Sequence, residues 1–230
     1  MTLLNDILKE MATPAHRKAI SSAKWHAPEQ VEQFLYDNGF DMIGEGIFAQ
    51  VWASPNSDKV VKFSTGHDRC YIKFAQHAQK HPSKYLPKVY DFIKYKVDQD
   101  EHSMDGKIMF ITVLEKLVPI DVEQIKMTDE NKSIIAWLYT QDMWQDGGKT
   151  LAKINKAFGI NAQHEEETEE VLRQMAEKLE NSNHPFVKIY HDMLGQFNKG
   201  SNNKCFGDLH DGNVFYRPSD STVVYIDPYV

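Results

Sequence analysis

Near the C-terminus the chain reads Cys205-Phe206-Gly207-Asp208-Leu209-His210-Asp211-Gly212-Asn213-Val214-Phe215-Tyr216, and then Val223-Val224-Tyr225-Ile226-Asp227-Pro228. Asp208 is followed five residues later by Asn213, and a second aspartate, Asp227, ends an apolar strand. One interpretation is a hairpin loop in which Asp, Asn and Gly only form turns. The other is a phosphoryl-transfer site, because that chemistry requires mainly positioned carboxylates, an amide and a cation.

The N-terminal half contains a second pattern, which favours the phosphoryl-transfer interpretation. A G-x-G turn followed by Val51 lies within Ile43-Gly44-Glu45-Gly46-Ile47-Phe48-Ala49-Gln50-Val51-Trp52. Two nearby glycines allow a strand-turn-strand to lie close over phosphates, and Lys62 in Val60-Val61-Lys62-Phe63 supplies a cation. Ala49 replaces a third glycine, so this motif alone is weak. Both motifs in kinase order within one chain indicate a protein-kinase-like fold.

Composition limits the partners and the location that we expect. The 230 residues can bury a substantial core, in one domain or in two lobes. The net charge of −7 argues against nucleic acid as the main partner, since phosphate backbones require a basic face. No apolar run is long enough to cross a bilayer, and Met1 to Glu10 lack the features of a signal peptide. We therefore expect a cytoplasmic protein without a membrane partner.

Periodicity predicts an α+β chain of two lobes, in which a small antiparallel sheet with one helix precedes a mainly helical part. We expect a helical extension over 1–39, an N-lobe over 40–114 and a truncated, helical C-lobe over 115–230. The predicted helices are 2–12, 28–38, 70–80, 129–145, 149–158, 165–181 and 185–197, and the predicted strands lie within 40–63, 89–97 and 107–114.

Two further motifs imitate binding sites. Gly147-Gly148-Lys149-Thr150 resembles the end of a P-loop, but Met143 replaces its first glycine, and a helix end followed by a new helix explains it better. His77 and His81 have helical spacing, but no acidic third ligand lies nearby in the sequence, so a zinc site is not expected.

With these residues in view, the chain resembles the early serine/threonine protein kinases of T-seven-like bacteriophages. The resemblance rests on the stretches 38–48, 60–62, 86–91, 208–213 and 225–228. It implies a kinase that acts on host proteins, with transcription or RNA-processing machinery among the candidates. The Gly207-Asp208-Leu209-His210 segment with Asn213 is also similar to aminoglycoside and choline kinases, which share the wider kinase-like fold.

The resemblance implies ATP and Mg²⁺ as cofactors and assigns roles to individual residues. Asp208 becomes the catalytic base, and Asn213 and Asp227 become magnesium ligands. Lys62 pairs with the ATP phosphates, and His210 either assists near the transferred phosphate or forms a structural hydrogen bond in the loop. Backbone and side chains around the nucleotide come from the covering turn and from the hinge at 113–117, and the residues expected there are Gly44, Glu45, Gly46, Val51, Glu115 and Leu117.

The chain departs from the kinase pattern at three points. No glutamate lies between Phe63 and Asp100, so the usual partner of the phosphate lysine is missing. Asp68 or Gln76 could replace it, or Asp227 alone could hold Lys62. Phe206-Gly207 replaces the His-Arg that precedes the base, which implies activity without control by loop phosphorylation. Pro228 follows the metal aspartate, so a mobile Asp-Phe-Gly switch is not expected.

Two alternatives stay open beside the protein kinase. A small-molecule kinase of the aminoglycoside type would explain why the helices that bind a peptide in ordinary kinases are not found after Asp227. A pseudokinase that inhibits a host factor by binding would explain the missing glutamate, although Asp208, Asn213 and Asp227 argue against it. The oligomeric state does not follow from the sequence.

Overall fold

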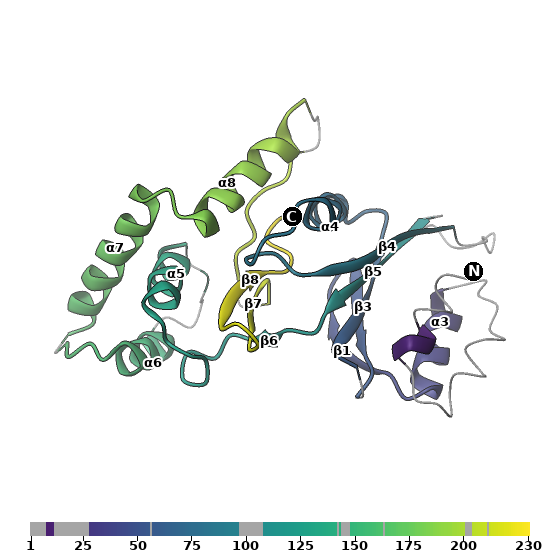
Figure 1. Ribbon diagram of the computed structural model, residues 1–230, viewed down its shortest axis with the longest axis horizontal. Helices are drawn as coiled ribbons and strands as arrows, with labels where there is room; N and C mark the ends of the chain where they lie inside the picture. The colour runs from purple at the N-terminus through teal and green to yellow at the C-terminus, as the bar shows by residue number, and fades with distance from the viewer. Residues whose placement is uncertain are drawn as a thin grey trace. The chain divides into compact units, whose positions relative to one another are not determined.

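The computed structural model describes residues 8–11, 28–55, 57–96, 108–141, 143, 148–162, 164–200, 204–210 and 212–230. The chain divides into two compact units (Figure 1). Unit 1 consists of Met1–Pro82 and Lys88–Lys116, and unit 2 consists of Ser83–Pro87 and Leu117–Val230. The fold is mixed α+β, with an antiparallel sheet and helices, as the sequence predicts.

Unit 1 contains a five-stranded antiparallel sheet with the strand order β1-β2-β3-β5-β4. Residues 60–64 of the central strand β3 are all buried, so both of its faces are covered. Helices α3 and α4 belong to this unit. The bounds are α3 Pro28–Asp37, β1 Asp41–Glu45, β2 Ala49–Ala53, β3 Lys59–Thr65, α4 Arg69–Lys80, β4 Val89–Lys96 and β5 Ile108–Glu115.

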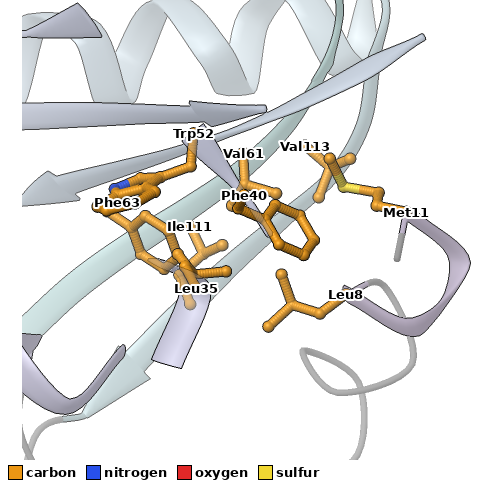
Figure 2. Close-up of a cluster of buried hydrophobic side chains, with 9 residues drawn as sticks. All are labelled: Leu8, Met11, Leu35, Phe40, Trp52, Val61, Phe63, Ile111 and Val113. Atoms are coloured by element: carbon orange, nitrogen blue, oxygen red, sulfur yellow. The ribbon is translucent and has the colours of Figure 1, made fainter. Parts of the chain in front are cut away.

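One face of this sheet forms the core of unit 1 (Figure 2). The N-terminal segment contributes Leu8, Met11 and Leu35 to it, so residues ahead of the sheet complete the core instead of forming a separate body. Removing such side chains from water is the main favourable term in folding. The sheet contributes the other members, which are Phe40, Trp52, Val61, Phe63, Ile111 and Val113.

The opposite face of the sheet carries a smaller apolar cluster. Side chains alternate along a strand, so Val60 and Lys62 point away from the core that Val61 and Phe63 fill. Ala53, Val60 and Leu114 are buried on this second face, with Val51 and Val89 packed against them. Lys62 therefore shares a face with an apolar patch.

Helix α4 follows the predicted pattern closely. Asp68 caps its N-terminus by accepting the backbone N–H of Tyr71, and the helix ends at Lys80, ahead of Pro82. The predicted apolar side is buried, and it consists of Tyr71, Phe74, Ala75 and Ala78.

In the described part of unit 2, helices α5 to α8 accompany a three-stranded antiparallel sheet, ordered β6-β7-β8. Helix α7 packs against α5 and α6. Its first turn carries Glu165, Glu166 and Glu167, which favour a helix N-terminus through the macrodipole. The bounds are β6 Val118–Pro119, α5 Asp129–Thr140, α6 Gly148–Phe158, α7 Glu165–Asn181, α8 Pro185–Asn198, β7 Val214–Arg217 and β8 Thr222–Tyr225.

The short segment Ser83–Pro87 is part of unit 2, although it follows α4 in the chain. Arg217 donates to the backbone oxygens of Lys84 (2.7 Å) and Leu86 (2.9 Å). The Tyr85 backbone oxygen accepts from the Tyr225 N–H (3.0 Å). Unit 2 therefore holds this segment through buried hydrogen bonds as well as through packing.

One predicted boundary is wrong. Helix α5 ends at Thr140 and not at Gln145. The N–H groups of Gln141 and Met143 both donate to the Leu138 backbone oxygen. The three-residue spacing of the Gln141 bond tightens the last turn and ends the helix. The predicted helix over 2–12 is helical at 8–11, and its other residues, like residues 98–106, lie outside the described part.

None of the helices in the described ranges is long and apolar enough to cross a membrane.

Candidate functional site

The residues predicted to form the site fall into two groups, one in each unit. Unit 2 brings together Asp208, Asn213 and Asp227, and Asn213 connects them. Its side-chain Nδ2 donates to the Asp208 backbone oxygen (2.8 Å) and to Asp208 Oδ2 (3.1 Å). Its backbone oxygen accepts the N–H of Ile226 (2.9 Å) and of Asp227 (3.4 Å). Because Asn213 is only 7% exposed, this arrangement is built into the fold.

A short antiparallel pairing holds Asp208 against the end of the chain. Phe206 and Val230 exchange two backbone hydrogen bonds, of 2.7 and 3.0 Å, and Gly207 pairs with Tyr229. The Asp208 N–H then donates to the Pro228 oxygen (2.9 Å). The backbone of Asp208 is therefore positioned by strand-like contacts, and its half-buried carboxylate lies beside the residues that follow β8.

Gly207, which replaces the arginine expected before the base, is required by its surroundings. A Cβ atom at this position would lie 2.0 Å from Tyr190 Oη. Tyr190 is held in a buried aromatic stack, with ring centroids 5.2 Å from Tyr229 and 5.8 Å from Tyr225. Burial, and then the negative charge of Asp208, raise the pKa of Tyr190. The sequence pattern did not reveal Tyr190, although a glycine beside the base is a signal of close packing.

His210 belongs to the hydrogen-bonded set of this loop. Its Nδ1 accepts the Gly212 N–H (3.0 Å). Nε2 lies 3.7 Å from Asp208 Oδ2 and 2.8 Å from Asn213 Nδ2. The bond to Gly212 is a hydrogen bond within the loop, and a role of His210 near the transferred phosphate stays a prediction.

The donor set of this loop fits a magnesium ion that shares its coordination with phosphates. Among the described residues, no group of three or more His, Cys, Asp and Glu side chains could hold a metal alone. Mg²⁺, however, is usually bound through one or two protein ligands together with phosphates and water. Asn213 Nδ2 is directed at Asp208, so Oδ1 is the atom of this side chain that could bind a cation. The Asp227 carboxylate offers further hard oxygen atoms of the kind that Mg²⁺ prefers.

In unit 1, Lys62 lies in the middle of the sheet, opposite Val51 on β2 and Thr112 on β5. Its side chain is only 8% exposed. The Nζ atom lies 3.4 Å from the ring centroid of Tyr71, the first buried residue of α4. A cation over an aromatic face is stabilised by about 2 kcal/mol when both are desolvated. The sequence predicts that Tyr71 lies on the apolar side of its helix, but it does not predict that the Tyr71 ring contacts the Lys62 ammonium.

The glycine turn joins β1 to β2. Gly44 pairs with Val51 and Glu45 with Gln50, and the Gly46 N–H donates to the Ala49 oxygen (2.8 Å). Ile47 at the tip is 92% exposed. A Cβ atom at Gly44 would approach Val51 to 3.7 Å, and one at Gly46 would approach the Ala49 oxygen to 3.9 Å. Both are ordinary contacts, so the unit itself does not require glycine at either position.

The predicted hinge residues Glu115 and Lys116 form hydrogen bonds within unit 1. The Glu115 N–H donates to the Lys88 oxygen (3.0 Å), and its carboxylate accepts the Lys88 N–H (2.8 Å). The Lys116 N–H donates to the Asp58 oxygen (2.7 Å). These donors already serve unit 1, so a pairing of adenine with the Glu115 N–H would have to break its hydrogen bond to Lys88, directly before β4. Leu117 is the first residue of unit 2 after the hinge.

No protein-family model matches the chain, and no curated protein matches it. Among solved structures, it is similar to a thermostable mutant of the aminoglycoside phosphotransferase APH(4)-Ia, in a ternary complex with AMP-PNP and hygromycin B. The similarity has 14% identity and a TM-score of 0.27, and it covers 59% of this chain and 40% of that chain.

Proposed function

We propose that this protein is a two-lobed, protein-kinase-like phosphotransferase that uses ATP and Mg²⁺. The observation that carries the proposal is Asn213, which links the Asp208 carboxylate to the backbone at Asp227. A hairpin that only reverses the chain does not require two carboxylates joined through a buried amide. Phosphoryl transfer requires such positioned groups, because the attacking hydroxyl and the charged phosphates must be held in line.

In this proposal each residue of the loop has a limited task. Asp208 accepts the proton of the acceptor hydroxyl. The hydroxyl oxygen then bonds to the γ-phosphorus of ATP, and the bond between the γ-phosphorus and ADP breaks. The Asn213 amide holds the Asp208 carboxylate in one orientation. Asn213 Oδ1 and the Asp227 carboxylate would hold Mg²⁺, whose charge offsets that of the phosphates. Lys62 contributes a cation, and the turn at Gly44 and Gly46 covers the nucleotide.

The acceptor that we propose is a serine or threonine hydroxyl on a host protein in the host cytoplasm, with transcription or RNA-processing proteins as first candidates. This choice follows from the phage-kinase resemblance in the motifs around Gly44 and Asp208. An aminoglycoside is the other candidate. Incubation with labelled ATP, Mg²⁺ and either bacterial lysate or hygromycin B separates them. Label on lysate proteins supports the protein kinase, and label only on hygromycin B overturns this acceptor.

The Asp208→Ala variant tests the proposed chemistry. We expect turnover to fall by about three orders of magnitude or more, because base and orientation are lost together. Asp192→Ala is the matched control, since Asp192 is an exposed carboxylate on α8 that pairs with Lys188. It should retain activity.

Thermal melting separates a loss of chemistry from a loss of structure. Asp208→Ala should melt close to the wild-type protein, and its unfolding would support a structural role for the loop. If the variant loses phosphotransfer but keeps its biological effect, the protein acts by binding, as a pseudokinase would.

A further inference from the structure

Helix α4 lacks the acidic residue that orients the phosphate-binding lysine in ordinary kinases. Over its whole described length, Arg69–Lys80, it contains no Asp or Glu. Of the two substitutes that the sequence suggests, Asp68 serves as the N-cap of the helix and accepts the Tyr71 N–H. Gln76 lies on the exposed side. The buried side of α4 is formed by other residues, of which Tyr71 is the first.

The residue of α4 that meets Lys62 is aromatic. The ammonium lies 3.4 Å from the Tyr71 ring centroid, which places it directly on the π-face. Tyr71 is 1% exposed and Lys62 8%, so water screens the contact little. The first turn of α4 holds the backbone of Tyr71 in place, because Asp68 accepts its N–H.

We propose that the Tyr71 ring is the positioning residue for Lys62 and replaces the helix glutamate of ordinary kinases. This inference rests on the proposed function. An aromatic face attracts a cation through its quadrupole but carries no net charge. Unlike a carboxylate, it orients the ammonium without placing a negative charge beside it. This suits a lysine whose charge must act on the ATP phosphates.

The contact itself can be measured without any substrate. A proton above an aromatic face is shifted upfield by the ring current, so the ε-methylene signals of Lys62 should lie upfield of those of other lysines. Lys62→Arg assigns them by their loss. We expect the shift in the wild-type protein and in Tyr71→Phe, which keeps the ring, and not in Tyr71→Leu. Lys62 signals at the ordinary lysine position in the wild-type protein would overturn the inference.

The role of the contact is measured by the Kd for Mg·ATP and by kcat. Tyr71→Leu should raise the Kd on the order of tenfold and lower kcat, whereas Tyr71→Phe should stay near wild type. Phe74→Leu is the matched control, because it removes a neighbouring ring that is equally buried at 1% exposure. It should lose thermal stability as Tyr71→Leu does, and keep the Kd and the Lys62 shift.

Two failures are distinguishable. A wild-type protein that binds no Mg·ATP overturns the proposed function, whatever the spectrum of Lys62. A wild-type protein that binds Mg·ATP while folded Tyr71→Leu binds it equally well overturns this inference alone. If Tyr71→Leu does not fold, the wild-type and Tyr71→Phe spectra still decide whether the ring holds the ammonium.

Discussion

The loop around Asp208 and the turn around Gly46 both contain two glycines, but these glycines have different surroundings. In the loop, a Cβ atom at Gly207 would lie 2.0 Å from Tyr190 Oη, and one at Gly212 would lie 2.8 Å from the His210 ring. In the turn, the closest approaches at Gly44 and Gly46 are 3.7 and 3.9 Å. The packing of unit 2 requires glycine at both loop positions, whereas the packing of unit 1 does not require glycine at either turn position.

The two regions differ in what lies beside their glycines. In the loop, Tyr190 and His210 occupy the space that side chains at Gly207 and Gly212 would take. In the turn, Cβ atoms at Gly44 and Gly46 would make only ordinary contacts. Glycine permits another molecule to approach the backbone closely, which agrees with the proposal that the turn covers a nucleotide.

The largest effect is expected for Gly207→Ala. The new methyl group collides with a tyrosine held in an aromatic stack, and such overpacking costs about 1–3 kcal/mol. Chemical denaturation should measure this loss of unfolding free energy, and activity should fall with it because Asp208 is displaced.

The double variant Gly207→Ala/Tyr190→Phe sharpens this test. Removing Oη relieves the contact at 2.0 Å and leaves one at 3.3 Å, to Tyr190 Cζ. The double variant should therefore be destabilised less than the two single variants together, by about 0.5 kcal/mol or more. Strict additivity would show that Tyr190 is not the reason for glycine at this position.

A smaller effect on stability, of opposite sign, is expected for Gly46→Ala. Gly46 does not adopt a positive φ, so alanine fits and should stabilise the protein by about 0.4–1 kcal/mol through the unfolded state. If the turn covers a nucleotide, the KM for ATP should nevertheless rise several-fold.

Gly195→Ala is the control for Gly46→Ala. Gly195 lies within α8, where a Cβ atom meets nothing within 4 Å. Alanine there should raise stability by about 1 kcal/mol and leave the KM unchanged. An unchanged KM in Gly46→Ala as well would remove the turn from the site.

The smallest effect concerns alkaline pH, which acts on the buried tyrosines of unit 2. Burial, and then the hydrogen bond to Glu130, raise the pKa of Tyr85 to about 12. Its neutral form is thus favoured in the folded state. This contribution is complete below the pKa of an unfolded tyrosine, about 10, and is lost as the pH rises toward 12. Denaturation midpoints should therefore fall between about pH 10 and 12.

Tyr85→Phe should make that fall less steep, because the group that titrates is gone. Tyr36→Phe, at an exposed tyrosine of α3, should leave the steepness unchanged. An equal pH dependence in both variants would contradict the role of Tyr85.

Much of the fold could be predicted from local patterns in the sequence. The apolar spacing of Tyr71, Phe74, Ala75 and Ala78 predicts the buried side of α4 correctly, because the helical period is a local property. The end of α5 was misplaced, because its termination depends on backbone hydrogen bonds to Leu138 and no proline or glycine marks the position. Leu8 and Met11 lie in the core of the sheet, although they are distant from it in sequence.

The candidate site divides in the same way. Asp208 and Asn213 lie within one tight loop, so their spacing alone predicts that they can meet. The partners of Lys62 and Gly207 come from other elements, α4 and α8, and neither Tyr71 nor Tyr190 is marked by a motif. Such contacts depend on how helices pack against strands, which residue spacing does not encode.

The amino-acid sequence alone determines most strands and helices, the short loop that contains Asp208 and Asn213, and the position of Lys62 on the central strand. Periodicity and turn chemistry act over a few residues, so they can be read directly. Only the tertiary structure decides that an aromatic ring of α4 faces Lys62, and that Gly207 has no alternative. Both outcomes arise from side chains that meet across elements, where close packing selects one neighbour from many possible ones.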